Sequence, residues 1–192
     1  MRSPRLLFAA ALLAPSFASA APLALTPASP QPDAAALSPG LYVEYVYPPD
    51  VRTLHEANSW KAGKSRGPDL VGFDYPDTEE GETALTSDQA EYVVAHIRGY
   101  LRFDEAGVYE LDFLSNDGLE AEIGGQVVSR VDGRQPCDNV GVETVSVPEP
   151  GWYEVKALWF QRLNTSCLLM EWKTPSAGEV DWVPNEAFAY AK

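Results

Sequence analysis

The polar run at residues 115–118, Ser-Asn-Asp-Gly, contains the residue types best suited to chemistry in this 192-residue sequence. Asn116 and Asp117 place an amide beside a carboxylate, directly after an alternating apolar segment. Polar side chains in a loop at the end of a strand are free to face a ligand. Turn formation explains them as well, because Asn and Asp bond to nearby backbone groups and Gly118 permits a positive φ. A ligand site and an ordinary turn therefore both remain open.

Two alternating segments precede this run and are expected to position it. Apolar side chains occupy every second position in residues 93–103, and the pattern recurs in residues 109–113. Alternation with a period of two is typical of half-buried β-strands and not of helices. The short connector at residues 104–107 ends in glycine, so we expect the two strands to pair as an antiparallel hairpin.

Further short alternating segments follow along the chain, separated by Gly, Pro or polar residues. They are residues 41–47, 119–123, 126–131, 142–147, 152–160 and 167–172. About eight strands at intervals of roughly 8–12 residues predict an all-β fold, an antiparallel β-sandwich or barrel in a single domain with little helix. Residues 50–91 lack the pattern. We expect an irregular long loop there, with Trp60 and Phe73 anchored in the core and some helix near residues 50–58.

The first 39 residues differ in composition from the rest of the chain. Two arginines precede an apolar run that ends in small residues, which predicts a secretory signal peptide at residues 1–20 with cleavage near Ala20. Residues 21–39, rich in Ala and Pro, are expected to form a flexible tether, and residues 40–192 the folded domain. No later segment is apolar enough for a transmembrane helix. We therefore expect an exported protein: periplasmic, cell-surface or extracellular.

The sequence contains two cysteines, Cys137 and Cys167, and many more acidic than basic residues. In an exported protein an even pair of cysteines is expected to form one disulfide, with two free thiols as the alternative. The formal net charge of −14 argues against nucleic acid and anionic membranes as partners. Solubility alone also explains an acidic surface.

Six short motifs occur in order between residues 99 and 172. They are Gly99-Tyr-Leu, Glu105-Ala-Gly-Val-Tyr, Leu114-Ser-Asn-Asp-Gly, Ile123-Gly-Gly-Gln-Val-Val, Glu149-Pro-Gly-Trp-Tyr and Glu171-Trp. Their order and spacing resemble the protective-antigen-type β-sandwich domain. That family is named after a bacterial toxin component and also occurs in yeast flocculins and adhesins and as insertions in some β-glucosidases. The resemblance covers about residues 40–190.

In adhesin members of that family, two adjacent aspartates hold a calcium ion, often across a cis peptide bond, and a second loop supplies an asparagine. The resemblance places Asn116 and Asp117 at the aspartate positions and Asn164 in the second loop. It thereby implies Ca²⁺ as a cofactor, held by the hard oxygen ligands that this ion prefers. Asn116 replaces a carboxylate with a neutral amide, which should weaken the ion's binding. An ordinary loop position is the alternative for Asn164. A bond between Cys137 and Cys167 would tie the walls of such a site together.

We expect a binding module and not an enzyme, because no nucleophile, metal or phosphate-loop motif occurs. Carboxylates for glycoside hydrolysis could be drawn from Asp112, Asp117, Glu120 and Glu122. Alternation, however, places Glu120 and Glu122 on a solvated strand face.

The resemblance implies carbohydrate recognition at a loop rim, with a glycan as partner. The aromatic side chains of Tyr100, Trp152 and Trp182 are candidates for stacking on sugar faces, and core packing is their alternative role. A second functional hypothesis is a cell-envelope adhesion or assembly module that binds a protein through the same scaffold. The fold alone does not decide between them.

Overall fold

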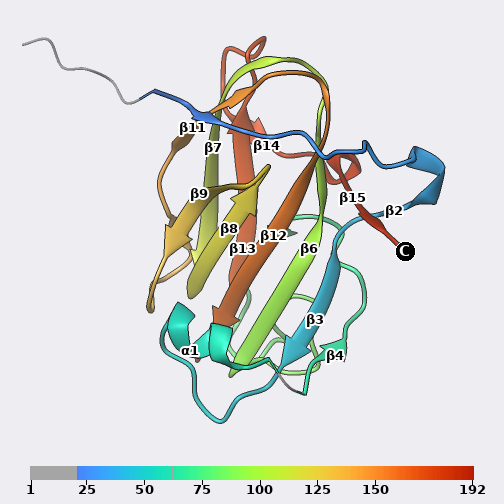
Figure 1. The fold of residues 1–192 in the computed structure, drawn as a ribbon. Coiled ribbons are helices and arrows are strands. Elements are labelled where there is room, and N and C mark those ends of the chain that lie inside the picture. The colour runs from blue at the N-terminus through green and yellow to red at the C-terminus, as the bar shows by residue number, and fades with distance from the viewer. Residues whose placement is uncertain (1–20, 62) are drawn as a thin grey trace, which may run out of the picture.

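Two stacked β-sheets form the protein, which is described by a computed structural model covering residues 21–61 and 63–192. The predicted signal peptide therefore lies outside the described residues. The sheets pack face to face as a sandwich, and neither closes into a barrel (Figure 1). This confirms the prediction of a single antiparallel all-β domain and selects the sandwich. No helix in the described ranges is long and apolar enough to cross a membrane.

The first sheet, here the β7 sheet, is built around the strand that leads to the polar run. Its strands follow the order β1 (Leu23–Ala24), β11 (Glu143–Val147), β7 (Gly107–Asn116), β13 (Cys167–Lys173) and β14 (Asp181–Trp182), and β10 (Asp138–Asn139) and β5 (Asp74–Tyr75) pair with β7 and β13. All neighbours are antiparallel except β1 and β11. In the β7–β13 register Asn116 lies opposite Cys167, which brings the end of β7 beside the start of β13.

The second sheet, here the β6 sheet, contains the two longest strands. Its order is β2 (Leu37–Pro39), β15 (Phe188–Ala191), β6 (Val93–Phe103), β12 (Gly151–Gln161), β8 (Gly118–Ile123) and β9 (Gln126–Val131); β3 (Tyr42–Val46) pairs with β6 and with β4 (Ser65–Arg66). The β8–β9 hairpin turns at Gly124 and Gly125, whose φ values of 55° and 78° suit glycine. Its two strands confirm the segments expected at residues 119–123 and 126–131. Two short 3-10 turns, η1 (Ala34–Ala36) and η2 (Asn185–Ala187), complete the elements.

The predicted hairpin between β6 and β7 is wrong, although both strands exist. β6 pairs with β12, β3 and β15, whereas β7 pairs with β11, β13 and β10. The connector at residues 104–106 carries the chain from one sheet to the other. Phe103 and Tyr109 then face each other across the core, with ring centroids 4.8 Å apart. A period of two is the same whether consecutive strands pair or face one another across a sandwich, so the pattern could not reveal the partner.

Residues 21–39 pack on the domain and do not form the flexible tether expected from their composition. β1 adds to the edge of β11, β2 pairs with β15, and Leu25 is only 3% exposed in the core. The Gln31 side chain accepts a hydrogen bond from the Trp152 backbone N–H (2.8 Å) and donates one to its carbonyl (3.0 Å). Backbone pairing with sheet edges thus holds a segment that has few large side chains to bury.

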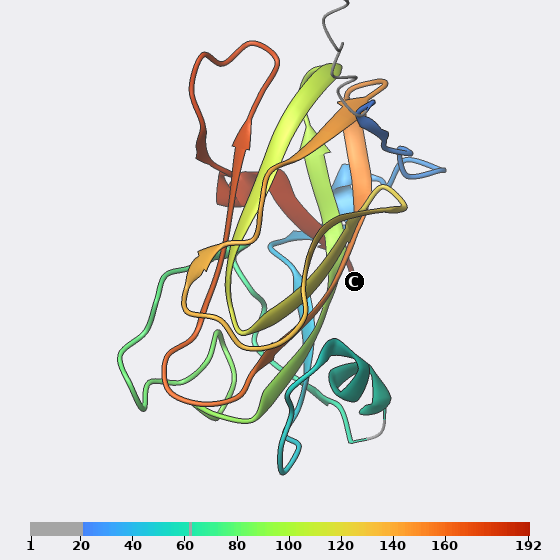
Figure 2. The same cartoon turned by 90° about the vertical axis from the view of Figure 1, so that its left-hand side faces the viewer.

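The predicted local helix is present as α1 (Leu54–Ser59). Thr53 caps it, because its hydroxyl accepts a hydrogen bond from the Glu56 backbone N–H (3.2 Å). Leu54 and Ala57 are buried against Phe160, so that α1 covers one end of the outer face of the β6 sheet (Figure 2).

The rest of residues 50–91 is irregular but partly anchored in the core. Phe73 is 1% exposed and packs edge-on against Phe113 and Phe188, as the sequence predicted for it. Trp60 was expected to be an anchor too, but it is 36% exposed. It directly follows the last residue of α1, on the side that faces solvent, and therefore does not reach the core.

Candidate functional site

The polar run lies at a rim of the sandwich, where the chain crosses between the sheets. β7 ends at Asn116, β8 begins at Gly118, and Asp117 alone connects them. The Asp117 backbone N–H donates to the carbonyl of Phe160 near the end of β12 (3.1 Å). The Asn116–Asp117 peptide bond is cis, the geometry that the resemblance associates with this position.

A pocket of about 390 Å³ opens at this rim. Its lining residues are Asn116, Asp117, Arg134, Gln135, Pro136, Leu163, Asn164 and Thr165. The structure therefore brings together all three predicted site residues, Asn116, Asp117 and Asn164. It adds a third wall, residues 134–136, that the sequence analysis did not single out. The one signal for that wall was Cys137, whose expected bond to Cys167 ties this loop to the site.

Asp117 is the buried carboxylate of the pocket, with 3% of its surface exposed. Its Oδ2 accepts a hydrogen bond from the Arg162 backbone N–H (2.9 Å), and its carbonyl accepts one from the Ser115 hydroxyl (3.0 Å). Burial raises the pKa of Asp117, while the backbone N–H groups of Arg162 and Gln135 and the nearby charge of Arg134 partly oppose this rise. Asp117 is thus held rigidly and is protonated more easily than an exposed aspartate.

Two amide side chains supply neutral oxygen atoms. Asn116 Nδ2 donates a hydrogen bond to Thr165 Oγ1 (3.1 Å), whereas Asn116 Oδ1 accepts none from the described residues. Asn164 is exposed and has a φ of 71°, a left-handed conformation that Asn tolerates better than most residues. Its backbone N–H donates to Glu91 Oε1 (3.1 Å). Both amides are therefore positioned by bonds that leave their side-chain oxygens available.

The loop at residues 161–166 is held from inside the protein. The Gln161 side chain is fully buried and donates to the carbonyl of Leu163 (2.9 Å). At the other end of the loop, the Ser166 backbone N–H donates to Thr78 Oγ1 (2.9 Å). These bonds fix the pocket wall that carries Asn164 without using the atoms that face the pocket.

Arg162 joins this loop to the segment before α1. Its guanidinium forms an ion pair with Asp50 (Nε–Oδ1, 2.8 Å), while its backbone N–H holds Asp117. Hydrogen bonds from Arg162 and Arg52 lower the pKa of Asp50 to about 2. Arg162 therefore positions Asp117 through its backbone.

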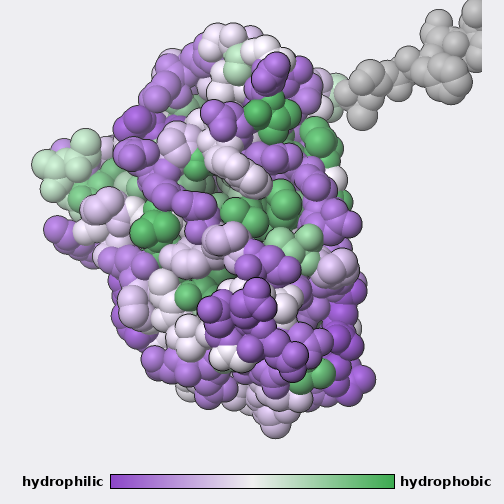
Figure 3. Space-filling model, turned by 180° about the vertical axis from the view of Figure 1, so that it is seen from behind, coloured by the Kyte–Doolittle hydropathy of each residue, from purple (hydrophilic) through white to green (hydrophobic). Residues whose placement is uncertain are grey.

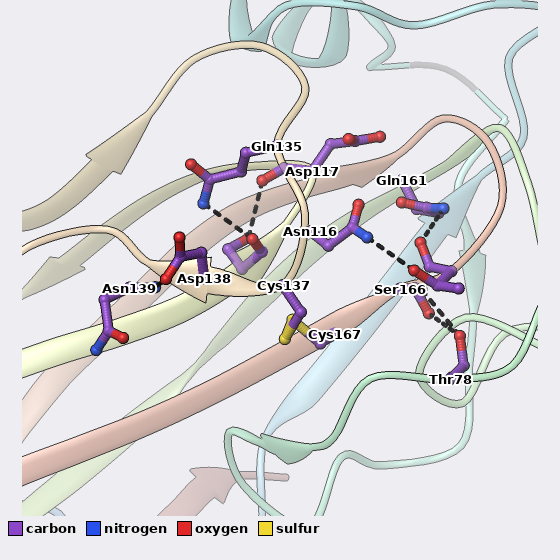
Figure 4. Close-up of a disulfide and its surroundings, with 12 residues drawn as sticks. Thr78, Asn116, Asp117, Gln135, Cys137, Asp138, Asn139, Gln161, Ser166 and Cys167 are labelled. Carbon is purple, nitrogen blue, oxygen red and sulfur yellow. Dashed lines mark hydrogen bonds between the residues drawn. A yellow bond between two sulfur atoms is a disulfide. The ribbon is translucent and has the colours of Figure 1, made fainter.

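A disulfide and a side-chain hydrogen bond hold the third wall (Figure 4). Cys137 and Cys167 are bonded, which confirms the predicted pairing and excludes the free-thiol alternative. Gln135 Nε2 donates to the carbonyl of Ser115 at the end of β7 (2.9 Å). Both contacts attach residues 134–137 to the strands that end at the pocket.

The pocket lacks the carboxylate pair that glycoside hydrolysis requires. Asp112 is buried and accepts hydrogen bonds from two backbone N–H groups and from the Asn139 side chain (2.8–2.9 Å), so its oxygens are occupied. Glu120 and Glu122 form ion pairs with basic residues of the β6 sheet. Of the four carboxylates considered, Asp117 alone lines the pocket.

The aromatic residues proposed for sugar stacking do not line this pocket. Trp152 is the second residue of β12 and Tyr100 lies opposite Glu154, so both are far along the strands from Phe160 and the rim. Trp182 is 52% exposed on β14 of the other sheet. Recognition at this pocket would therefore depend on polar groups and not on an aromatic platform.

Comparison with known families gives the same architecture. The family model described as "PA14 domain" matches residues 72–185, more than half of the chain. The protein belongs to the PA14 domain family. The match makes the broader protective-antigen-type resemblance more specific, and it includes the whole pocket. A search of curated proteins found no match.

Solved structures with this PA14 fold include three informative neighbours. The PA14 domain of the MpAFP antifreeze protein aligns with a TM-score of 0.65 at 16% identity, covering 83% of this chain and 93% of its own. A "PA14 sugar-binding domain from RTX adhesin" aligns with a TM-score of 0.59 at 15% identity, covering 80% of this chain and 99% of its own. The A domain of epithelial adhesin 9 from Candida glabrata, in complex with Galb1-3GlcNAc, aligns with a TM-score of 0.68 at 12% identity. The alignment covers 89% of this chain and 97% of the adhesin domain. At these identities the similarity establishes the fold.

Proposed function

We propose that this PA14 domain is a non-catalytic carbohydrate-binding module and that the pocket at Asn116, Asp117 and Asn164 receives a sugar. The observation that carries the proposal is the convergence of these three residues, from two loops distant in sequence, on one pocket. A fixed carboxylate and free amide oxygens are suitable acceptors for sugar hydroxyls. Neighbours named as a sugar-binding PA14 domain and as an adhesin domain in complex with a glycan support this choice.

The location that fits this function is outside the cytoplasm. The Cys137–Cys167 disulfide is favoured in oxidising compartments. Together with the expected cleavage near Ala20, it supports a periplasmic, cell-surface or extracellular module whose partner is a glycan of a cell envelope.

The oxygen atoms of this pocket suit Ca²⁺ as a cofactor. Its oxygen donors are the Asp117 carboxylate and the side-chain amides of Asn116 and Asn164, which are the hard ligands that Ca²⁺ takes. When bound, the ion would supply coordination to vicinal sugar hydroxyls. A single carboxylate implies weak binding, with a dissociation constant of about 10⁻⁴–10⁻³ M, as in extracellular calcium modules.

Thermal melting tests the calcium proposal. With a dissociation constant of about 1 mM, addition of about 10 mM Ca²⁺ should stabilise the native state by roughly 1.4 kcal/mol, which raises Tm by about 3–6 °C for a domain of this size. EDTA should reverse the shift, and Asp117→Asn should abolish it. An unchanged Tm at that concentration would rule out the ion.

Binding to a glycan array, followed by calorimetry on the best ligand, tests the sugar site. Asp117→Asn keeps an oxygen acceptor for the Arg162 N–H but removes the charge, so the fold should be retained while binding falls at least about tenfold. Asp138→Asn is the matched control, because Asp138 is an exposed carboxylate outside the pocket. Binding that survives Asp117→Asn would place the sugar elsewhere.

A second function, recognition of a protein, is favoured by the outer face of the β7 sheet. Val108, Val142, Val180 and Trp182 are 50–62% exposed there, and Figure 3 shows apolar patches among polar residues on this side of the molecule. Such patches commonly mark protein contacts. If this face binds the partner, Trp182→Ser should reduce retention of the purified protein on cell envelopes, and Asp117→Asn should not.

A further inference from the structure

Arg134 gives the pocket a second charge that its PA14 motifs did not predict. Asp117 and Arg134 are the two charged residues that line the pocket. Five other arginines of the described chain form ion pairs with carboxylates: Arg52, Arg66, Arg102, Arg130 and Arg162. Arg134 forms neither an ion pair nor a hydrogen bond with any described residue, although acidic residues greatly outnumber basic ones. Its guanidinium is therefore available at the mouth of the pocket.

Two contacts close to Arg134 in the sequence anchor its backbone. The next residue, Gln135, bonds to the Ser115 carbonyl (2.9 Å), and Cys137 is joined to Cys167. Asp117, which also lines the pocket, is held by the Arg162 backbone N–H. Because these walls are already ordered, little loop entropy would be lost when a ligand binds between them.

The two charged side chains suit different parts of one ligand. Asp117 and the amides of Asn116 and Asn164 offer oxygen acceptors for hydroxyl groups, whereas Arg134 offers only donors. A guanidinium presents a planar set of N–H donors that matches a carboxylate in a bidentate arrangement. Asn116 also matters here, because an additional carboxylate at its position would repel an anionic ligand. The charge of Arg134 acts on the nearby Asp117, but a neutral sugar would leave the guanidinium without a carboxylate bonded to it.

We propose that Arg134 makes this pocket selective for a carboxylate-bearing sugar. The sugar carboxylate binds the Arg134 guanidinium, and hydroxyl groups of the same residue bind Asn116, Asp117 and Asn164. This specificity rests on the sugar-binding function proposed above. Uronic and sialic acids share the required chemistry, since both carry a carboxylate and vicinal hydroxyls.

Calorimetry with matched ligand pairs tests the selectivity. The pairs are tetragalacturonate against its methyl ester, and 3′-sialyllactose against lactose, which separate the two sources of the carboxylate. We expect the acid of one pair to bind at least about tenfold more tightly than its neutral partner, the range of one charge-assisted bidentate contact. The advantage should shrink when the salt concentration rises from about 20 to 300 mM, because an exposed ion pair is screened.

Variants identify the residue responsible. Arg134→Gln should remove the preference for the acidic ligand while retaining the binding of its neutral partner. Arg134→Lys should keep part of the preference for the acidic ligand. Arg130→Gln removes the same charge from β9, outside the pocket, and should leave the preference unchanged.

Two results would overturn the inference in distinguishable ways. Equal binding of acid and neutral ligands by the wild type, or a preference that persists in Arg134→Gln, would refute the role of Arg134 while leaving sugar binding intact. Failure of all four ligands to bind would refute the selectivity. Failure of the whole glycan array would refute the sugar-binding function as well.

Discussion

Loss of the Cys137–Cys167 disulfide should destabilise the protein and loosen the pocket. The bond closes a loop with a sequence separation of 30 residues, which contains β11, β12 and the wall at residues 161–166. Cys137 follows Arg134–Pro136 closely, and Cys167 starts β13 opposite Asn116. The same link therefore contributes to global stability and to the geometry of the pocket.

The expected loss follows from the entropy of closing that loop in the unfolded chain. For a separation of 30 residues, the chain-entropy relation gives about 12 cal/mol/K, or about 3.6 kcal/mol at 25 °C. In a domain of this size the corresponding decrease in Tm is about 7–14 °C. Residues 134–136 should also lose order, because the covalent tie of the adjacent Cys137 to β13 is gone and only the Gln135–Ser115 hydrogen bond and the pairing of β10 with β7 remain beside them.

Urea denaturation measures this effect when it is applied to three samples. They are the oxidised protein, the protein with reductant and a Cys137→Ser/Cys167→Ser variant. Reduction and the double variant should both lower the free energy of unfolding by about 3–4 kcal/mol. Reductant should not affect the double variant further, which controls for side effects of the reagent. A loss below about 1 kcal/mol would refute the loop-entropy reasoning, since it would mean that the unfolded chain gains little freedom.

Three further predictions concern single residues. Asp112→Ala should lower the free energy of unfolding by about 3 kcal/mol in urea melts, because it leaves two backbone N–H groups and an amide without their buried acceptor. A loss of stability no larger than that caused by Asp138→Ala, at an exposed position, would contradict this. Gly118→Ala should lower the free energy of unfolding by roughly 1–3 kcal/mol, because its Cβ would collide with the Phe160 ring; unchanged stability would show that the ring can move freely. Burial raises the pKa of Asp117 above the usual value of about 3.9, so its contribution to stability is present below the unfolded pKa and is lost as pH rises through the folded pKa. Ligand binding requires the ionised carboxylate, so ligand affinity should change with pH in the opposite direction to this contribution to stability. Calorimetry between about pH 4 and 7 should show that affinity falls on acidification at a pH above that at which an exposed aspartate titrates. A midpoint of this fall at or below the usual aspartate pKa would contradict the assignment.

Strand positions could be predicted from the sequence, but strand partners could not. Alternation located β6, β7, β8, β9 and β12, because the inward face of each strand must be apolar to form the core. The same alternation is produced by a hairpin partner and by a strand facing across the core, which explains the wrong pairing of β6 with β7. Residues 21–39 were misjudged because they are held chiefly by backbone hydrogen bonds to sheet edges, which leave no pattern in composition.

The pocket at the rim was predictable on two of its three sides. Asn116, Asp117 and Asn164 stand within family motifs or in the loop that the resemblance identified, and the structure brings them together. Arg134 and Gln135 follow β9 in an irregular loop without periodicity, and they reach the pocket through contacts between residues distant in sequence. Only the expected disulfide beside them indicated that their loop lies there.

Mapping of the sugar contact by NMR tests the central claim most directly. A ¹⁵N-labelled protein would be titrated with the best ligand from the glycan array while the backbone amide signals are followed. We expect the largest chemical-shift changes at Asp117, Arg134 and Asn164, and we expect Asp117→Asn to remove them. Changes confined to the outer face of the β6 or β7 sheet, with the pocket amides unmoved, would contradict it.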